Sequence, residues 1–380
     1  MKVEQKIWNT KSGWTSYSEH ELGTKVNLVF ALGPIDLISQ KRILADLQKF
    51  YPNADIVLSS AYSNIFNTKI TKNDDVVVSA LQFEKTTVQA LHLNIKEVKD
   101  SFDLGTHISA NLNKENIKGL LVFSDSFPII NASHLVTGLH FNLSEHIPIL
   151  GGLASGHRGE RPMVGLNELP KQGNVIGIGL SGDYIQIGHG IDIGWTPFGT
   201  ERFITKSKDN VVYQLDHMTP YELYELYLKD LVEDVSEAAR QFPLGIYLDT
   251  STQRLIRTVI DVDKKTGAVT YSGEVPQGEK ARMMKTNISK LIDAAGEAAE
   301  RSCSDFKIKE PDFSFLVNCK GRQAVLEDWA QEEIDTVITN LGKNTPVMGY
   351  YSLGEIAPLD PGKKGELLNQ TITITSLKEN

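Results

Sequence analysis

One pattern occurs three times in the sequence, and this repetition constrains the fold more than any single motif. Each time, a short apolar run is followed by apolar residues spaced as on one face of a helix. A break then leads to a second apolar run, which enters a turn of small residues. The three segments span about residues 26–64, 120–159 and 313–358. We therefore predict three strand–helix–strand units.

Each segment has roughly 35–45 residues, close to the length of a crossover unit, in which a helix connects two parallel strands. Common descent of the three segments within one chain would explain the repetition. Crossover units are also frequent in mixed chains, so three of them can arise by chance. Both explanations predict α/β character.

Antiparallel strands are expected outside these units. Residues 163–216 form short alternating runs separated by Gly, Pro, Asn and Asp, a pattern typical of hairpins. Residues 371–375 alternate apolar and polar side chains, and we expect them to add an edge strand. The predicted fold class is therefore α/β (mixed α+β), with strand–helix–strand crossover units and added antiparallel sheet.

The clearest helix start also gives the domain boundary. Thr219, Pro220 and Glu222 are a capping residue, a first-turn proline and a capping-box glutamate. We place the boundary just before this helix. Residues 1–25 show no pattern and are expected to be a loosely held lead-in. The two predicted domains are then residues 26–218 and 219–380.

Composition excludes several classes of protein. The 380 residues carry a formal net charge of -9 without a basic block, which argues against binding to nucleic acid or an anionic membrane surface. Cys303 and Cys319 are too few for a disulfide framework or a thiolate metal site. No apolar run approaches the roughly 20 residues of a spanning helix, and no secretory h-region is present. We expect a cytoplasmic protein without membrane insertion.

Motifs of known enzymes occur only in part. Residues 177–182 match the dinucleotide pattern G-x-G-x-x-G, but a strand-like alternation follows where a helix is required, so we predict a glycine-rich hairpin. Ser352 lacks the first glycine of a nucleophile elbow, and Pro358 prevents a helix from beginning at once. The histidines show no metal-ligand spacing. We therefore predict no catalytic residue, no metal and no cofactor.

The candidate site lies where the two strands of the third segment end. In open α/β sheets, ligands bind outside the carboxyl ends of strands. If the strands are neighbours, Arg322 and Glu355 would share one rim, and a zwitterion such as an amino acid would match both charges. A direct Arg322–Glu355 salt bridge explains these residues equally well. The predicted ligand-binding residues are Cys319, Gly321, Arg322, Tyr350, Ser352, Gly354 and Glu355.

At these residues the chain resembles the FIST family, over about residues 26–371. The strongest match joins residues 319–322 (CKGR), 349–358 (GYYSLGEIAP) and 369–371 (NQT). Residues 151–154 (GGLA) resemble part of the family's N-terminal block. The first turn departs from the family's C-S-T-A-G-E-I run. Serine stands in place of both the cysteine and the glycine of that run, and asparagine stands in place of its glutamate. These replacements are Ser59, Ser63 and Asn64.

The resemblance implies paired N-terminal and C-terminal sensory domains that bind small ligands such as amino acids, with no established catalysis. The sequence shows no kinase, cyclase or DNA-binding segment, so we expect a signalling partner to act in trans. Two other hypotheses remain open. One is an enzyme with Cys319 or Ser352 as its nucleophile, and the other is a scaffold for protein interactions.

Overall fold

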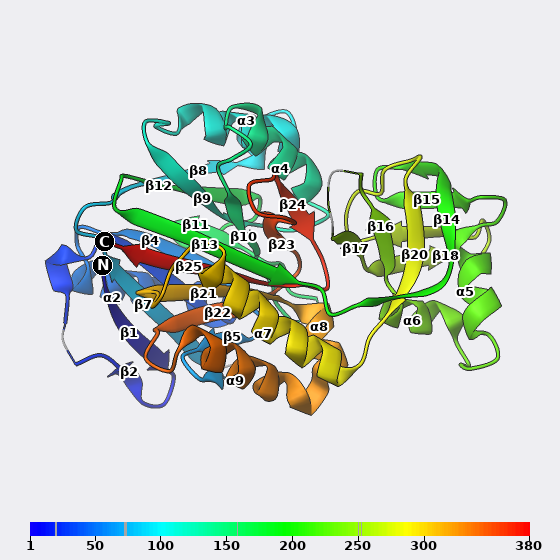
Figure 1. Cartoon of the computed structure of the whole chain (residues 1–380). Coiled ribbons are helices and arrows are strands. Elements are labelled where there is room, and N and C mark those ends of the chain that lie inside the picture. Colours follow the sequence, from blue (N-terminus) through cyan, green and yellow to red (C-terminus); the bar gives the residue numbers. More distant parts are fainter. Residues whose placement is uncertain (20, 72–73, 158, 250, 252) are drawn as a thin grey trace.

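The computed structural model describes residues 1–19, 21–71, 74–157, 159–249, 251 and 253–380. Within this part of the chain, three six-stranded sheets form a main body, and a seven-stranded sheet stands apart from it (Figure 1). None of the described helices combines the length and the apolar composition needed to cross a membrane. The mixed α/β class predicted from the sequence is confirmed.

All three predicted crossover units are present, each with a parallel strand pair. They are called the first, second and third units, in chain order. The first contains β3 (Leu28–Gly33), α1 (Ile35–Ile38), α2 (Lys41–Phe50) and β4 (Asp55–Ser60). The second contains β9 (Ile117–Ser124), α4 (Ala132–Phe141) and β10 (Ile149–Leu153). The third contains β21 (Phe313–Cys319), α8 (Lys320–Leu326), α9 (Ala330–Leu341) and β22 (Val347–Ser352).

Each parallel pair lies inside its own sheet, with antiparallel strands on both sides. The first sheet has the order β11-β4-β3-β7-β1-β2, with β11 (Val164–Leu166), β7 (Asp75–Gln82), β1 (Lys2–Asn9) and β2 (Gly13–Ser16). The second has the order β24-β23-β10-β9-β12-β8, with β24 (Gly365–Leu368), β23 (Glu355–Pro358), β12 (Asn174–Ser181) and β8 (Thr87–Asn94). The third has the order β6-β5-β22-β21-β25-β13, with β6 (Lys69–Ile70), β5 (Asn64–Phe66), β25 (Ile372–Glu379) and β13 (Ile185–Asp192).

The three units exchange strands in a cycle. After β4 the chain enters the third sheet as β5, after β22 it enters the second sheet as β23, and after β10 it enters the first sheet as β11. A second set of strands is exchanged in the opposite sense. After β7 in the first sheet the chain enters the second sheet as β8, and after β12 in the second sheet it enters the third as β13. The first sheet in turn holds β1, from the start of the chain. The chain ends close this cycle, with the Met1 amine 3.2 Å from Glu379 (Figure 1). The main body therefore has approximate threefold symmetry.

Aromatic and aliphatic side chains from all three sheets fill the centre of the body. Phe30, Phe123 and Phe315, one from the first strand of each unit, lie with ring centroids 5.2–5.5 Å apart. Helices cover the outer faces: α2 on the first sheet, α3 (Ser101–Asn111) and α4 on the second, and α7 (Ile288–Ser304) and α9 on the third. Each strand of a unit is thus buried on both faces, which explains its nearly continuous apolar sequence.

The separate sheet is inserted between β13 and α7. Its order is β17-β16-β20-β14-β15-β19-β18, and its two edge strands are consecutive in the chain, so the sheet curls back on itself. The strands are β14 (Thr196–Lys208), β15 (Val211–Leu215), β16 (Leu244–Tyr247), β17 (Arg254–Arg257), β18 (Val259–Asp263), β19 (Ala268–Tyr271) and β20 (Lys280–Lys285). The predicted boundary at 218 and 219 falls within this sheet, which takes strands from both sides of it.

Helical elements on this sheet complete the fold. They are α5 (Pro220–Leu228), α6 (Val235–Ala238) and the 3₁₀ turn η3 (Ala239–Gln241). The predicted capping box is present, since the Thr219 hydroxyl accepts from the Glu222 amide and the Glu222 carboxylate accepts from the Thr219 amide. The remaining 3₁₀ turns are η1 (Gly23–Lys25), η2 (Ile95–Glu97) and η4 (Glu327–Trp329).

Three sequence predictions are wrong in detail. Residues 1–25 are not a loose lead-in, because β1 is a partly buried strand in which the Glu4–Lys6 ion pair (2.8 Å) and the hydrogen bond from Gln5 to Ser79 satisfy the polar side chains. The C-terminal strand β25 lies between β13 and β21 and is not an edge. The glycine-rich residues 177–182 do not join a hairpin, because β12 and the following β13 belong to different sheets.

Candidate functional site

The turns that end the second strands of the three units meet at one point of the main body. The Ser155 amide donates to the Ser60 carbonyl (3.1 Å), and the Tyr351 amide donates to the Ser63 carbonyl (3.0 Å). The Leu153 amide donates to the carbonyl of Gly354 (2.8 Å). Arg158, at the end of the second unit's predicted turn, lies outside the described residues. Residues far apart in the sequence are thus fixed by backbone hydrogen bonds at a common junction.

Strands β21 and β22 are neighbours, and the structure brings their ends together at this junction. Cys319 lies directly opposite Ser352 in the parallel register. Six of the seven predicted ligand-binding residues are buried, and Gly321 is half-buried. The predicted group is therefore mostly an internal polar cluster.

Arg322 has a different partner from either one expected. Its side chain is fully buried, and Nε lies 2.5 Å from Oε1 of Glu333, whose side chain is also fully buried. The guanidinium also donates to the carbonyls of Ile193 (3.0 Å) and Leu291. Asn318 donates to the second carboxylate oxygen of Glu333 (2.6 Å). This pair holds α8 to α9 and does not place Arg322 on an open rim with Glu355.

Glu355 is a buried carboxyl with three hydrogen-bond donors. Oε1 accepts from the Ser352 hydroxyl (2.5 Å), and Oε2 accepts from the hydroxyl (2.8 Å) and the amide (3.3 Å) of Thr371. Burial nevertheless raises the pKa of Glu355 from its ordinary 4.5 to about 8, because the low dielectric disfavours the charged form more than these donors favour it. Glu355 can therefore change its protonation state near neutral pH.

Cys319 and Tyr350 lie close to this carboxyl. Burial, and then the charge of Glu355, raise the pKa of the Cys319 thiol to about 12, although the backbone amides of Gly321, Arg322 and Gln370 act in the opposite direction. The same two causes raise the pKa of Tyr350. Since the thiolate is the reactive form of cysteine, Cys319 in this state is a poor nucleophile.

Gly152 allows the third unit's turn to approach the second unit this closely. A Cβ atom at this position would lie 2.6 Å from a methyl group of Val317 and 2.8 Å from the Gly354 carbonyl oxygen. Gly152 pairs with Glu355 across β10 and β23. A side chain here would displace the strand that carries the carboxyl.

Gly321 connects the buried cluster with a surface cleft of about 510 Å³. The cleft lies between α8 and the seven-stranded sheet. Gly321 and Gln370 lie at its inner end, and a Cβ atom at position 321 would lie 2.5 Å from the Gln370 amide nitrogen. The cleft is lined by Glu237, Arg240, Gln241, Phe242, Thr258, Val259, Lys285, Thr286, Gly321, Ala324, Val325, Glu327 and Gln370.

Gln370 separates the cleft from the cluster. Its backbone is left-handed (φ 58°), its side chain is buried, and its amide donates to the Thr258 hydroxyl (3.2 Å) across the cleft. Its side-chain carbonyl oxygen is buried without a hydrogen-bond partner among the described residues. Thr371, the next residue, binds Glu355. A movement of Gln370 would therefore shift Thr371 and change its hydrogen bonds to the Glu355 carboxyl.

Glu333, Gln370 and Thr371 were missed as site residues by the sequence reasoning. Glu333 had a signal, since it is a carboxylate on the apolar face of its helix, three residues after Ala330 and one before Ile334. Gln370 and Thr371 follow Asn369 in the N-x-T motif, which alone does not reveal their position. No group of His, Cys, Asp and Glu suited to a metal ion occurs in the part of the chain that the structure describes.

Comparison with known proteins assigns the chain to a family through two adjacent matched segments. No curated protein matches the sequence. Family models match almost the whole length, the FIST N domain over residues 27–218 and the FIST C domain over residues 220–358. The buried Glu355 turn belongs to the second match, and the chain belongs to the FIST family.

Proposed function

We propose that this protein senses a small zwitterionic ligand, such as an amino acid, in the cleft between α8 and the seven-stranded sheet. FIST domains are generally considered sensory and signal-transduction domains. The observation that carries the proposal is the position of the cleft, which is closed at its inner end by Gln370 and Gly321 and backed by the Glu355 cluster. A ligand bound there would contact both the main body and the inserted sheet.

The chemistry of the cleft supports a ligand with charges of both signs. Arg240 and Lys285 supply cations, and Glu237 and Glu327 supply carboxylates. Arg240 and Glu237 are 3.6 Å apart and more than half exposed, so exchanging one partner for a ligand group costs little. An apolar wall of Phe242, Val259, Ala324 and Val325 would take an aliphatic or aromatic side chain.

Contacts between the inserted sheet and the main body support the proposal that the protein signals to a partner. Arg257, which is buried in the sheet, donates to the Leu367 carbonyl (2.9 Å) and to the Asn369 side chain (3.3 Å). Asn369 immediately precedes the Gln370 that closes the cleft. We infer that ligand binding changes the orientation of the inserted sheet, and that a signalling protein acting in trans reads this change.

The test is a thermal-shift screen with the amino acids, followed by calorimetry with the ligand that stabilises most. Arg240→Ala should weaken its affinity about tenfold or more, because it removes a charge-assisted contact to the ligand carboxylate. Glu327→Gln should weaken it by a smaller factor. Arg42→Ala, which alters an exposed ion pair on α2 far from the cleft, is the matched control and should change nothing.

Two outcomes would contradict the proposal. One is that no amino acid raises the melting temperature, and the other is that the affinity is the same in Arg240→Ala, Glu327→Gln and the parent protein. A partner that co-purifies equally well with and without the bound amino acid would favour the scaffold hypothesis instead.

A further inference from the structure

A second pocket lies in the N-terminal half, at the position in the second unit that corresponds to the cleft in the third. The pocket borders the turn into β12, and the cleft borders the turn into β25. β12 pairs with β9, the first strand of the second unit, and β25 pairs with β21, the first strand of the third unit. Each turn holds a left-handed residue, Gly173 in one and Gln370 in the other. The pocket has a volume of about 710 Å³.

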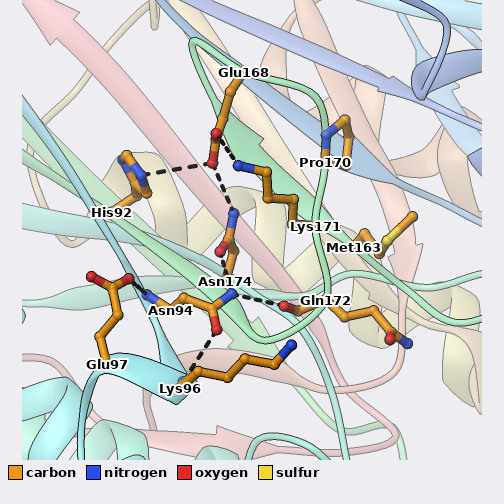
Figure 2. A pocket seen from close by; sticks show the side chains of 10 residues that line it. All are labelled: His92, Asn94, Lys96, Glu97, Met163, Glu168, Pro170, Lys171, Gln172 and Asn174. Atoms are coloured by element: carbon orange, nitrogen blue, oxygen red, sulfur yellow. Dashed lines mark hydrogen bonds and ion pairs between the residues drawn. The ribbon is translucent and has the colours of Figure 1, made fainter.

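Polar side chains from three segments line this pocket (Figure 2). They come from β8, from η2 and from the segment 168–174, which leads from β11 into the first residue of β12. Met163 and Pro170 add an apolar wall on one side. The lining residues are His92, Asn94, Lys96, Glu97, Met163, Glu168, Pro170, Lys171, Gln172 and Asn174.

Most hydrogen-bond acceptors of the pocket already accept from donors of the pocket lining. Glu168 contacts Lys171, Asn174 (3.4 Å) and His92 (3.7 Å), and the Lys171 hydrogen bond is the main cause that lowers its pKa and keeps it ionised. The Asn174 side-chain oxygen accepts from Asn94 (2.6 Å), and the Asn94 oxygen accepts from the Lys96 amide (3.1 Å). These contacts appear as dashed lines in Figure 2.

Two donors remain without acceptors among the described residues. The Lys96 ammonium has no carboxylate within ion-pair distance, and the Gln172 side-chain nitrogen is buried without a hydrogen-bond partner. The Gln172 oxygen already accepts from Arg161 (3.4 Å), so rotating this amide would only exchange one unmet group for another. In Figure 2 the Lys96 side chain extends toward the side of the pocket that holds Gln172. An excess of donors in a pocket calls for a ligand that supplies acceptors.

We propose that this pocket binds the carboxylate of a small organic acid, as a site separate from the cleft. One carboxylate oxygen would accept from the Lys96 ammonium and the other from the Gln172 amide, while Met163 and Pro170 contact the organic part. Lys171 is already neutralised by Glu168, so among the described lining residues Lys96 is the one cation, and Glu97 the one carboxylate, without an ion-pair partner. A single cation matches a monovalent carboxylate better than a divalent phosphate.

The experiment is a titration of the full chain, followed in amide nitrogen–proton spectra. The probes are lactate, succinate, benzoate and, for comparison, inorganic phosphate. We expect saturable shifts of the Asn94 and Gln172 side-chain amides with at least one of the three acids. Lys96→Gln should weaken that affinity about ten- to a hundredfold, because it removes a charge-assisted hydrogen bond. Lys96 is exposed, so the variant should fold normally.

Two controls fix the location of binding. Lys99→Gln removes an exposed lysine three residues further along and should leave the affinity unchanged. Arg240→Ala alters the cleft and should also leave it unchanged. The proposal is overturned if none of the acids gives saturable shifts, if Lys96→Gln binds as well as the parent protein, or if phosphate binds more tightly than every acid.

Discussion

Glu355 and Asn64 occupy equivalent places in the main body but have different surroundings. Each is the first residue of the strand that its unit passes to a neighbouring sheet, β23 and β5 respectively. Both are buried, with exposed fractions of 0% and 1%. Glu355 has three donors from Ser352 and Thr371, whereas the Asn64 side-chain oxygen has no hydrogen-bond partner among the described residues.

The comparison shows that one backbone arrangement can serve different purposes. The first and third units share the parallel pair, the turn and the exchanged strand. The third unit adds a titratable carboxyl, and behind it a buried Arg322–Glu333 ion pair. We infer that the first unit is structural at this position, and that the third carries the chemistry.

The largest expected effect comes from breaking that ion pair. Glu333→Ala leaves the fully buried Arg322 without its carboxylate, and removing one partner of a buried pair typically costs about 3–5 kcal/mol. Urea denaturation measures this loss in the free energy of unfolding. Glu332→Ala, at the preceding and exposed position, should stay within about 0.5 kcal/mol of the parent protein. A loss for Glu333→Ala no larger than this control would show that the pair is not the anchor of α8.

The next effect is a pH dependence that belongs to Glu355. Its pKa is higher in the folded protein (about 8) than the ordinary 4.5, so the folded state holds a proton that the unfolded state releases. Stability from this group is therefore complete below pH 4.5 and is lost as pH rises toward 8, by up to about 1.4 kcal/mol per pH unit.

Glu355→Gln isolates this contribution. The amide stays neutral, so the slope of unfolding free energy against pH between 4.5 and 8 should become flatter than in the parent protein. Urea denaturation at a series of pH values measures both slopes. Equal slopes in the two proteins would mean that Glu355 does not titrate in this range.

The smallest expected effect is at the equivalent position of the first unit. Asn64→Leu removes an oxygen that has no partner among the described residues, so the free energy of unfolding should change by less than about 1 kcal/mol. Asn318→Leu is the matched control, because it removes the hydrogen bond to Glu333 (2.6 Å) and should cost about 1–3 kcal/mol. If Asn64→Leu lowered the free energy of unfolding more than Asn318→Leu does, the inference that the first unit is only structural at this position would be wrong.

Much of the fold could be predicted because its signals are local. The apolar spacing of residues 330–341 predicts α9, and Asn287 caps α7 by accepting from the Lys290 amide. The sequence does not reveal the N-terminal strand β1, because three of its four buried positions are Glu4, Gln5 and Lys6, whose partners are distant in sequence or on the strand itself. A run of polar residues is typical of a loop, so the sequence pattern alone does not identify such a run as a buried strand.

The candidate site was predicted only in part. The sequence placed Cys319 and Ser352 at the ends of two strands, and these residues lie opposite each other in the parallel register. It did not show that Arg322 pairs with Glu333, or that Gln370 and Thr258 meet across a cleft. Both contacts depend on how α9 and the inserted sheet pack, which local spacing does not encode.

The sequence by itself determined the three strand–helix–strand units, because the spacing of apolar residues predicts which strands and which helix faces are buried. Only the tertiary structure decided how the units combine. The passage of β5, β11 and β23 into neighbouring sheets depends on backbone hydrogen bonds between distant residues, such as Ser63 and Tyr351, and these bonds carry no side-chain signature. The same packing removed Glu355 from water and thereby raised its pKa.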